Sequence, residues 1–341
     1  ANVSIGTVDR VLHNRGFVSP CTQRKVEWAI KKLNYTPNIY ARQLKLSKRY
    51  KFGVFMPEVH QDAGYWGQAA LGIRKAAKEL EPYKIKVKIF PFNRYSENSF
   101  CKKFSQMLEE NLDGFLIAPI LGEKCKALVA QIPESVPYIF FDSDLPHTQR
   151  LTFIGQDPFK SGMLAGKLMH LLIGDHGDVA VIRILPEDYH INLRSEGFQS
   201  YFSENGSTHT IKVYDWHERR NLNQIYTLFN KIVIKNPNLR GIFMTNALTY
   251  LVASYLESKK LNKKIRVIGY DLVEENIAYL KNSIIDFLIS QSPMTQGYQG
   301  IMLLYRKIVL NHDIEERIMM PIDIVTKENI EFYKYASVEN V

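Results

Sequence analysis

The chain has 341 residues, 45% of them hydrophobic and 23% charged, with a formal net charge of +9 at pH 7. That length exceeds one compact core and fits two or three globular domains, and no apolar run approaches the roughly 18–20 residues that span a bilayer. No charged-then-apolar leader is visible, and the three cysteines lack metal-type spacing, so we expect a cytoplasmic protein with reduced thiols.

The positive charge is concentrated at the amino end. Residues 1–51 hold eleven basic side chains against two acidic ones, and the 33 basic and 33 acidic side chains that remain leave 52–341 neutral. A short basic segment beside a neutral remainder predicts a polyanion-binding module attached to a domain with a different task.

Helical patterns fill this basic segment. Ser4 can cap a first helix, and Asn14–Gly16 is typical of a turn. Ser19, followed by a first-turn proline, can cap a second helix. Asn38 can cap one further short helix that runs to about Leu46.

From residue 51 onward, short β-branched or aromatic runs alternate with longer amphipathic stretches. Apolar strands separated by helices predict parallel sheets covered on both faces, and the number of strands favours two doubly wound α/β lobes over one sheet. The predicted strands are Phe52–Met56, Ile85–Phe90, Gly114–Ala118, Pro137–Phe141, Val179–Ile184, Thr210–Tyr214, Gly241–Met244, Ile265–Gly269, Ile285–Ser290 and Ile322–Val325. The predicted helices include Tyr65–Leu80, Ser96–Asn111, Phe159–Leu172, Asn192–Phe202, Leu222–Lys235, Leu248–Lys259, Glu274–Asn282 and Thr295–Val309.

The order and spacing of residues in the basic segment are recognisable. They are Ala1-Asn2-Val3-Ser4, Thr7-Val8, Arg10-Val11-Leu12, Val18-Ser19, Asn34-Tyr35, Pro37-Asn38 and Ala41-Arg42-Gln43-Leu44. On these residues the chain resembles the LacI/GalR family of bacterial transcription regulators. The remainder is similar to that family's effector domain, which is itself like periplasmic sugar-binding proteins. The resemblance covers nearly the whole chain and implies a partial helix-turn-helix headpiece (1–37), a hinge helix with its linker (38–50), an amino-terminal lobe (51–155 with 292–320) and a carboxy-terminal lobe (156–291 with 321–341).

The resemblance implies that the second helix of the helix-turn-helix begins at Ser4 and enters the major groove. Arg10 would then bind guanine with two hydrogen bonds, and Ile5 would touch a thymine methyl group. The hinge helix would order on operator DNA and wedge Leu44 between base pairs in the minor groove. Taken alone, Arg10 fits a solvated arginine and Leu44 a core residue, but the register of the headpiece favours DNA contact. The expected DNA-binding set is Ser4, Ile5, Thr7, Arg10, Asn14, Asn38, Arg42, Leu44 and Lys45.

The chain opens at Ala1, inside the turn, without the helix that braces the recognition helix in this family. We therefore expect the natural protein to begin several residues upstream. We also expect residues 1–341 alone to bind operator DNA weakly or not at all.

Polar residues follow several predicted strands, at the edge where ligands meet the loops of doubly wound sheets. The set resembles the sugar-contacting residues of ribose-type binding proteins and of their repressor relatives. Carboxylates and amides pair with hydroxyl groups, an arginine bridges two oxygens, and aromatic faces pack on the C–H face of a sugar ring. The expected effector-binding residues are Tyr65, Trp66, Asp142, Asp157, Arg194, Asn246, Asp271 and Gln291.

Each of these residues has a structural alternative. The two aromatic residues could serve packing between the lobes, and the polar residues could instead be strand-end groups that cap the next helix, an alternative that the local motifs make weaker for Arg194, Asn246 and Asp271 than for Asp142, Asp157 and Gln291. Two positions depart from the family pattern: Ala247 replaces the aspartate that usually follows the asparagine, and Pro158 replaces an asparagine that often follows the aspartate.

Two other function classes compete with a regulator. Asp142-Ser143-Asp144 superficially resembles the Asp-x-Asp motif of aspartyl-phosphate phosphatases, but Leu145-Pro146 does not continue that motif. Nucleophile-elbow, phosphate-loop and metal motifs are absent and the nine histidines are scattered, so we expect no enzyme activity, no metal and no cofactor. A sugar-binding protein of a transport system would share the effector fold but not the basic helical segment.

The sequence therefore predicts a two-lobed α/β protein, like the periplasmic binding proteins, preceded by a small all-α headpiece. We expect a sequence-specific DNA-binding regulator that acts as a homodimer on a roughly palindromic operator. Its operator affinity would be controlled by a small effector between the lobes, a monosaccharide or derivative. We expect no membrane partner.

Overall fold

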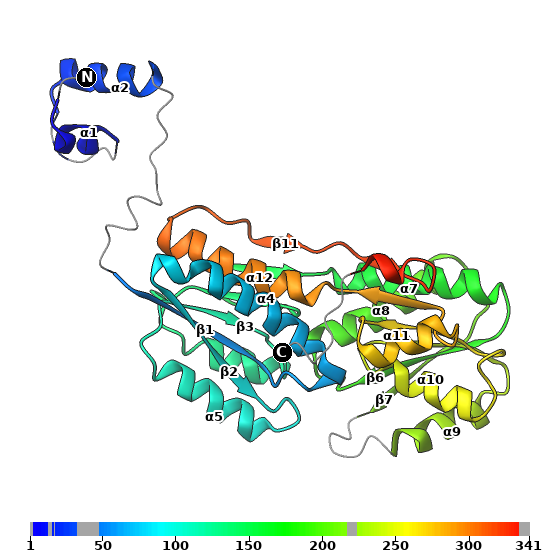
Figure 1. The fold of residues 1–341 in the computed structure, drawn as a ribbon. Helices are drawn as coiled ribbons and strands as arrows, with labels where there is room; N and C mark the ends of the chain where they lie inside the picture. Colours follow the sequence, from blue (N-terminus) through cyan, green and yellow to red (C-terminus); the bar gives the residue numbers. More distant parts are fainter. Residues whose placement is uncertain (1–2, 13–15, 17, 33–47, 217–223, 334–341) are drawn as a thin grey trace. The chain divides into compact units, whose positions relative to one another are not determined.

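The computed structural model describes residues 3–12, 16, 18–32, 48–216 and 224–333. The chain divides into two compact units, Ala1–Lys48 and Arg49–Val341. The first is a small helical unit, and the second is a larger α/β unit (Figure 1). Among the described helices, none is both long and apolar enough to cross a membrane.

The small unit contains helices α1 (Ile5–Leu12) and α2 (Pro20–Lys32). Both begin where the sequence predicts. The hydroxyl of Ser4 accepts a hydrogen bond from the backbone N–H of Thr7 at 3.2 Å. The hydroxyl of Ser19 accepts one from the N–H of Thr22 at 3.4 Å. The third predicted helix, ending near Leu46, lies outside the described residues.

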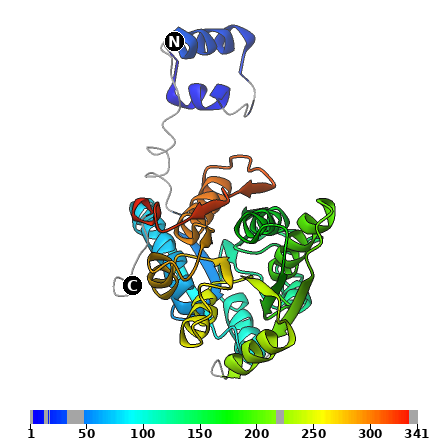
Figure 2. The ribbon, with the colours of Figure 1, turned by 90° about the vertical axis from the view of Figure 1, so that its right-hand side faces the viewer.

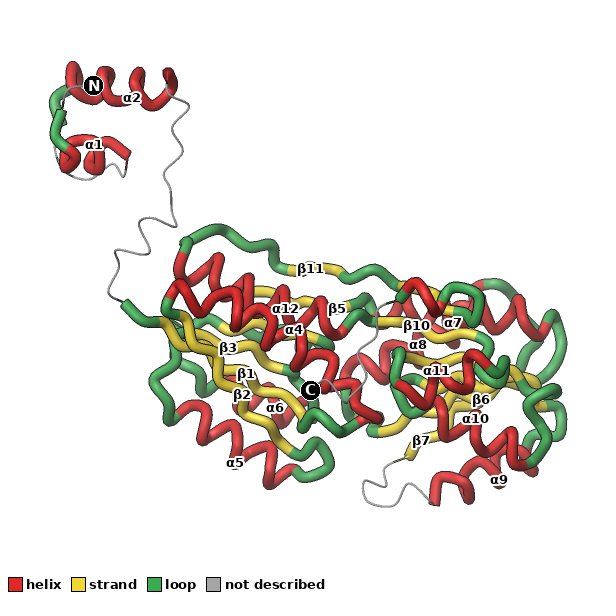
Figure 3. Tube along the Cα trace, in the orientation of Figure 1, coloured by secondary structure: helices red, strands yellow, loops and turns green. Residues whose placement is uncertain are grey.

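The large unit is built on two six-stranded sheets, each wrapped by helices (Figure 3). The strand order of the first sheet is β11-β5-β4-β3-β1-β2, with all neighbours parallel. Its strands are β1 (Tyr50–Pro57), β2 (Ile85–Phe92), β3 (Gly114–Ile117), β4 (Tyr138–Phe141), β5 (Thr152–Gly155) and β11 (Arg317–Met319).

The second sheet has the order β12-β10-β9-β8-β6-β7 and is parallel except for β12, which runs antiparallel to β10. Its strands are β6 (Asp178–Ile184), β7 (Ile211–Trp216), β8 (Leu239–Met244), β9 (Arg266–Tyr270), β10 (Phe287–Ser290) and β12 (Asp323–Val325). The prediction of two parallel α/β lobes is therefore confirmed.

Helices cover both faces of each sheet because the strands alternate buried apolar residues between two cores. In the first sheet, Val54 joins the core under α4 (Tyr65–Leu80) and α12 (Pro293–Leu304), whereas Phe55 joins the core under α5 (Glu97–Leu108) and α6 (Gly122–Val129). In the second sheet, Val181 joins the core under α7 and α8, and Ile182 the core under α9, α10 and α11. These helices span Pro158–Ile173, Tyr189–Glu204, Ile225–Lys235, Thr249–Ser258 and Glu274–Lys281. Figure 2 shows the helices and strands of the same ribbon from a second direction, turned by 90°.

Two strands and one α-helix were absent from the sequence prediction, as were the 3₁₀ turns Asp62–Gly64, Glu81–Tyr83 and Ile330–Phe332. β5 and β11 are strands of four and three residues, and α6 is a helix of eight, so each is too short for a clear periodic signal. A further difference lies at the end of α12, where the last turn, Tyr305–Val309, winds as a π-helix. α8 also begins three residues earlier than Asn192, at Tyr189.

The chain passes between the two sheets three times. It leaves the first sheet after β5, returns to it after β10 by way of α12, and leaves again between β11 and β12. The carboxyl ends of strands from both sheets therefore contribute neighbouring loops. The residue boundaries assigned to the two lobes remain a prediction.

Candidate functional site

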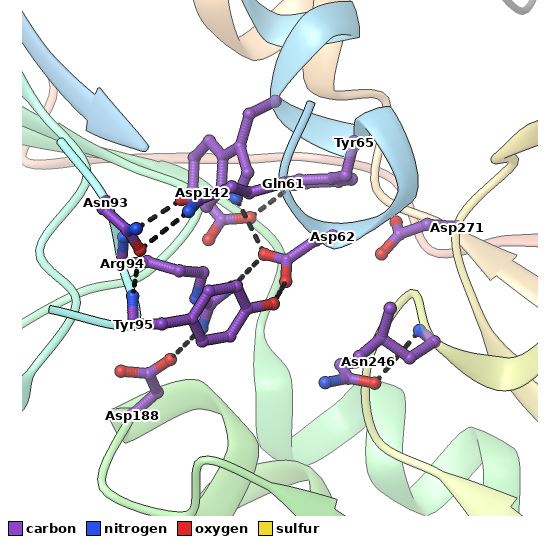
Figure 4. A network of polar contacts seen from close by, with 12 residues as sticks. Gln61, Asp62, Tyr65, Asn93, Arg94, Tyr95, Asp142, Asp188, Asn246 and Asp271 are labelled. Carbon is purple, nitrogen blue, oxygen red and sulfur yellow. Dashed lines mark hydrogen bonds and ion pairs between the residues drawn. The ribbon is translucent and has the colours of Figure 1, made fainter. Parts of the chain in front are cut away.

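Loops at the carboxyl ends of strands from both sheets meet in one buried polar network (Figure 4). The first sheet contributes the loops after β1, β2 and β4, and the second sheet those after β6, β8, β9 and β10. The charged members are almost fully enclosed, with exposed fractions from 1% to 8%: Asp62, Arg94, Asp142, Asp188, Arg194 and Asp271.

One part of the network is centred on Asp62. Its carboxylate accepts hydrogen bonds from the indole N–H of Trp66 and from the hydroxyl of Tyr95, each at 2.8 Å, and it pairs with the guanidinium of Arg94. The second amino group of Arg94 reaches Oδ2 of Asp188 at 2.5 Å. Because Asp62, Trp66, Arg94 and Tyr95 follow strands of the first sheet and Asp188 follows β6 of the second, Arg94 bridges the two lobes.

The other part of the network contains Tyr65, Asp142, Arg194, Asp271 and Gln291. The Tyr65 hydroxyl donates to Oδ1 of Asp142. Arg194 donates to the side-chain oxygen of Gln291, and the Gln291 amide donates to both carboxylate oxygens of Asp271 at 3.0 Å. These residues thus face one another from the two sheets with carboxylate, amide, hydroxyl and guanidinium groups.

Close packing of two helices places Arg194. A Cβ atom added to Gly162 of α7 would lie 2.1 Å from the backbone oxygen of Arg194, so only glycine lets α7 approach α8 this closely. The guanidinium then stacks on Tyr270, 3.8 Å from the ring centroid, and donates to the carbonyl of Thr245 at 2.8 Å. Arg194 is 2% exposed and is held in one orientation.

The backbone turns sharply at several of these positions. Asp62, Asp142 and Asp271 have φ values of 53°, 70° and 71°, in the left-handed region that costs energy for residues other than glycine. Such strain persists where surrounding contacts fix it, and it is common at ligand sites. For Asp142, the contact is a hydrogen bond from its N–H to Oε1 of Gln296 at 2.8 Å.

Burial dominates the electrostatics of the second group. It raises the pKa of Asp142 to about 6 and that of Asp271 to about 7, although hydrogen bonds and the positive charge of Arg194 pull both pKa values down. Burial, reinforced by both carboxylates, also raises the pKa of Tyr65, which keeps its hydroxyl a donor. These carboxylates are only partly compensated by the protein's own groups.

Arg94 shows the opposite balance. Burial alone lowers its pKa, but the negative charges of Asp62 and Asp188 outweigh that effect and raise the pKa above its ordinary value. His190 lies one helical turn before Arg194 on α8, and burial together with the charges of both arginines lowers its pKa well below 6.5. The imidazole is therefore neutral at pH 7.

Four buried polar atoms in this region have no hydrogen-bond partner within the described part of the chain. They are Nε of Arg94, Nε of Arg194, Nδ1 of His190 and Oγ of Ser143. Buried polar groups in folded proteins are nearly always paired, so unpaired ones call for a ligand or water. Together with the carboxylates they offer both donors and acceptors.

The structure joins five of the eight predicted effector residues in two neighbouring hydrogen-bonded groups, Tyr65 with Asp142 from the first sheet and Arg194, Gln291 and Asp271 from the second. Trp66 is buried, bonds to Asp62 and packs edge-on against Tyr65. Asp157 accepts a hydrogen bond from the N–H of Lys160 at 2.9 Å and so caps α7. Asn246 accepts one from the N–H of Leu248 at 3.1 Å, before α10. Ligand contact by these residues remains a prediction.

Sequence reasoning missed Asp62, Arg94, Tyr95, Asp188 and His190. Every one of them follows a strand of the site, which is the rule that found the others. The signal was therefore present, but these residues lie several positions beyond the predicted strand ends, in loops and in the first turns of helices whose course the sequence does not reveal.

In the small unit, Ser4 and Thr7 are joined through their hydroxyl groups at 2.9 Å, and Arg10 is exposed on α1. The Ser4 hydroxyl thus serves the start of the helix. The other predicted DNA contacts lie outside the described residues: Asn14, Asn38, Arg42, Leu44, Lys45 and the side chain of Ile5.

Each of the two units matches a known protein family. Residues 1–38 match the lacI family of bacterial regulatory proteins, and residues 52–311 match the periplasmic binding protein domain. The ribose operon repressor of Lactococcus lactis is 25% identical, over 97% of this chain and 95% of that protein. The transcriptional repressor PurR of Histophilus somni is 26% identical, over 90% of each chain.

Solved structures agree with this assignment. A chain from Bacteroides fragilis assigned to the LacI transcriptional regulators superposes with a TM-score of 0.79 at 28% identity, covering 84% of this chain and 100% of that one. GanP, a glucose-galactose binding protein of Geobacillus stearothermophilus, shares the fold with a TM-score of 0.75 at 22% identity, covering 83% and 99% of the two chains. The chain therefore belongs to the LacI family of bacterial regulatory proteins, with an effector domain of the periplasmic binding protein family.

Proposed function

We propose that this regulator represses transcription by binding operator DNA as a homodimer in the cytoplasm, and that a small hydroxyl-rich effector held between its lobes controls that binding. The observation that carries the proposal is the buried network in which Asp142 and Tyr65 of one lobe face Arg194, Asp271 and Gln291 of the other. This network lies on a chain whose first residues match a DNA-binding family.

A sugar fits the chemistry of the network. Each hydroxyl group both donates and accepts a hydrogen bond, so it can donate to the carboxylates of Asp142 and Asp271 and accept from the unpaired Nε–H of Arg194. A ligand that touches residues of both lobes binds the closed arrangement more tightly than an open one and shifts the population toward it. A coupling of about 1–3 kcal/mol between the sites would change operator affinity roughly 5- to 150-fold.

The names of similar proteins support this effector class. Relatives of the chain include repressors of ribose and sucrose operons, and similar folds include sugar-binding proteins. A transport protein without DNA binding is the alternative, but the family match over residues 1–38 and the nearly full-length similarity to repressors favour a regulator. We propose no catalytic step, because Asp142 is engaged by Tyr65 and by its neighbours as a binding group.

Operator binding tests the DNA-facing half of the proposal. In a chain that carries a complete headpiece, Arg10→Ala should weaken binding to an operator selected from random DNA by ten-fold or more, about 1.4 kcal/mol, because a bidentate base contact is lost. Leu44→Ala should weaken it by a similar factor and leave sugar binding unchanged. Lys102→Ala removes an exposed charge from α5 and serves as the control. Fluorescence anisotropy in which Arg10→Ala binds as tightly as Lys102→Ala would contradict the assignment.

The effector-facing half is tested with sugars. A thermal-shift screen of neutral sugars, including D-ribose, D-galactose and sucrose, should find one that stabilises the protein, by about 2.7 kcal/mol at 100 times its Kd. The same sugar should change operator affinity. If neither these sugars nor their phosphates alter stability or operator binding, a sugar effector is excluded.

A further inference from the structure

The first residue before α8 is an aspartate that does not cap its own helix. The Asp188 side chain makes no capping hydrogen bond to α8. At the matching position of α7, Asp157 accepts a bond from the N–H of Lys160 at 2.9 Å. Aspartate is among the best capping residues, so the carboxylate of Asp188 has been diverted to another partner.

Both oxygens of Asp188 are bound by the opposite lobe. Oδ2 accepts from Arg94 at 2.5 Å, and Oδ1 accepts from the backbone N–H of Leu121 at 3.0 Å. Arg94 follows β2 and Leu121 follows β3, which are strands of the first sheet, whereas Asp188 follows β6 of the second. With an exposed fraction of 1%, this carboxylate is a buried link across the junction of the lobes.

The backbone around Leu121 is shaped for this link. Leu121 has a φ of 61°, a left-handed conformation that a leucine adopts only when its surroundings enforce it. A Cβ atom added to the next residue, Gly122, would lie 3.0 Å from the carbonyl oxygen of Glu187, so the two lobes touch here through their backbones. The contact therefore has a defined geometry on both sides.

Arg94 is anchored independently of Asp188. Its other amino group pairs with Asp62, which also accepts hydrogen bonds from Trp66 and Tyr95 within the same lobe. If the lobes separate, Arg94 keeps Asp62 and only the bonds to Asp188 are lost. The freed carboxylate then lies beside the first turn of α8, where the N–H of Ile191 donates to the backbone carbonyl of Asp188 at 3.1 Å and can turn to the side-chain carboxylate instead.

We propose that Asp188 is a closure switch: it clamps the lobes together through Arg94 and Leu121 when they are closed, and it caps α8 when they are open. It is a positioning residue that acts on the effector site through the population of the closed state. The proposal rests on the effector-controlled function proposed above. It implies that the lobes have an intrinsic closing preference, separate from the contacts that the effector makes to Arg194 and Asp271.

One substitution separates the two roles of this side chain. Asparagine caps helices about as well as aspartate but carries no charge to bind Arg94, so Asp188→Asn weakens the closed state and preserves the open one. For the scattering measurement, in which no sugar is present, Asp157→Asn is the matched control, because it makes the same change at a capping position that is bonded within its own helix. Asp215→Asn is a second control, since it removes an ion pair with Arg183 that joins β6 and β7 within one lobe.

Two measurements on the whole chain decide the matter. In small-angle X-ray scattering without sugar, Asp188→Asn should have a larger radius of gyration than the wild type, and both controls should not. In calorimetric titrations with the sugars that bind, Asp188→Asn should raise every Kd by one common factor, on the order of ten or more, because the binding-competent fraction falls equally for all of them.

The outcomes are distinct. An unchanged radius of gyration together with unchanged Kd values overturns the switch. Kd changes that differ from sugar to sugar make Asp188 a direct effector contact and also overturn it. If none of the sugars binds the wild type, the proposed effector function fails, while the scattering comparison still tests whether Asp188 clamps the lobes.

Discussion

Two buried arginines of the effector site, Arg94 and Arg194, occupy contrasting surroundings. Arg94 has both amino groups committed to carboxylates, those of Asp62 and Asp188. Arg194 is bound instead by neutral groups, the side chain of Gln291 and a backbone carbonyl, and it stacks on Tyr270. We therefore call Arg94 saturated, because both of its amino groups pair with carboxylates, and Arg194 unsaturated, because its amino groups bind neutral acceptors.

This difference assigns them different tasks. Around Arg94 the protein supplies both carboxylates that pair with the guanidinium, although burial still raises the pKa of Asp188, and such a cluster can hold structural elements together. Around Arg194, the pKa values of Asp142 and Asp271 rise to about 6 and about 7, which shows that the protein compensates their charges incompletely. An incompletely compensated cluster keeps capacity for a ligand that brings its own donors.

The largest effect should come from removing the saturated arginine. Arg94→Gln leaves Asp62 and Asp188 buried without a cation, and breaking a buried ion pair in this way typically costs about 3–5 kcal/mol. Urea denaturation should therefore show a loss of unfolding free energy of that order. The double variant with Asp188→Asn should lose less than the sum of the single changes, because the two residues share one interaction. Additive losses would show that Arg94 and Asp188 are not coupled.

Removing the unsaturated arginine should instead affect the ligand. Arg194→Gln deletes a charged donor that faces Asp142 and Asp271, so effector binding should weaken by about a hundred-fold or more, equivalent to about 2.7 kcal/mol. Operator binding without effector should be retained, which separates this variant from a folding defect. If calorimetry finds effector affinity within a few-fold of the wild type, Arg194 belongs to the scaffold and the contrast with Arg94 collapses.

The sequence was sufficient to predict long periodic elements and the general location of the site. α4 spans Tyr65–Leu80 as predicted, because sixteen residues of amphipathic pattern leave no ambiguity about its period. β11 was missed since three residues with partly exposed side chains carry no such pattern. The rule that polar residues follow parallel strands located Asp142 and Asp271, because strand ends of this fold converge in space.

The sequence could not predict in the same way which group each aspartate binds. Asp157 and Asp188 both follow a strand and precede a helix, yet one caps its helix and the other binds across the lobes. The partner of Asp188, Arg94, is 94 positions away in the chain and on another sheet. Only the three-dimensional course of the loops determines which aspartate meets a cation, so local sequence cannot distinguish the two.

The smallest of the expected effects concerns pH and tests the incomplete compensation around Arg194. The pKa of Asp271 is about 7 in the folded protein, against an ordinary value of 3.8, so the folded state holds a proton that the unfolded chain has released between those pH values. Stability contributed by this group is present at low pH and is lost as pH rises toward 7. Asp271→Asn removes the titration, so the variant should gain unfolding free energy relative to the wild type between pH 5 and pH 7.5, by on the order of 2 kcal/mol.

The difference in unfolding free energy between variant and wild type at each pH isolates the contribution of Asp271 from those of the groups around it. Both proteins contain the neighbouring titratable and charged groups, Tyr65, Asp142, Arg194 and His190. His190 changes stability with pH in the direction opposite to Asp271, because its pKa is lowered and its contribution to stability is lost as pH falls through 6.5. A sugar hydroxyl that donates to Asp271 should lower the pKa of that carboxyl and release protons near pH 6.5. Calorimetric titrations in two buffers of different ionisation enthalpy measure this release, which Asp271→Asn should reduce. Equal pH profiles for variant and wild type, with no proton release, would mean that the protein's own groups compensate the charge of Asp271 and would remove the contrast with Arg94.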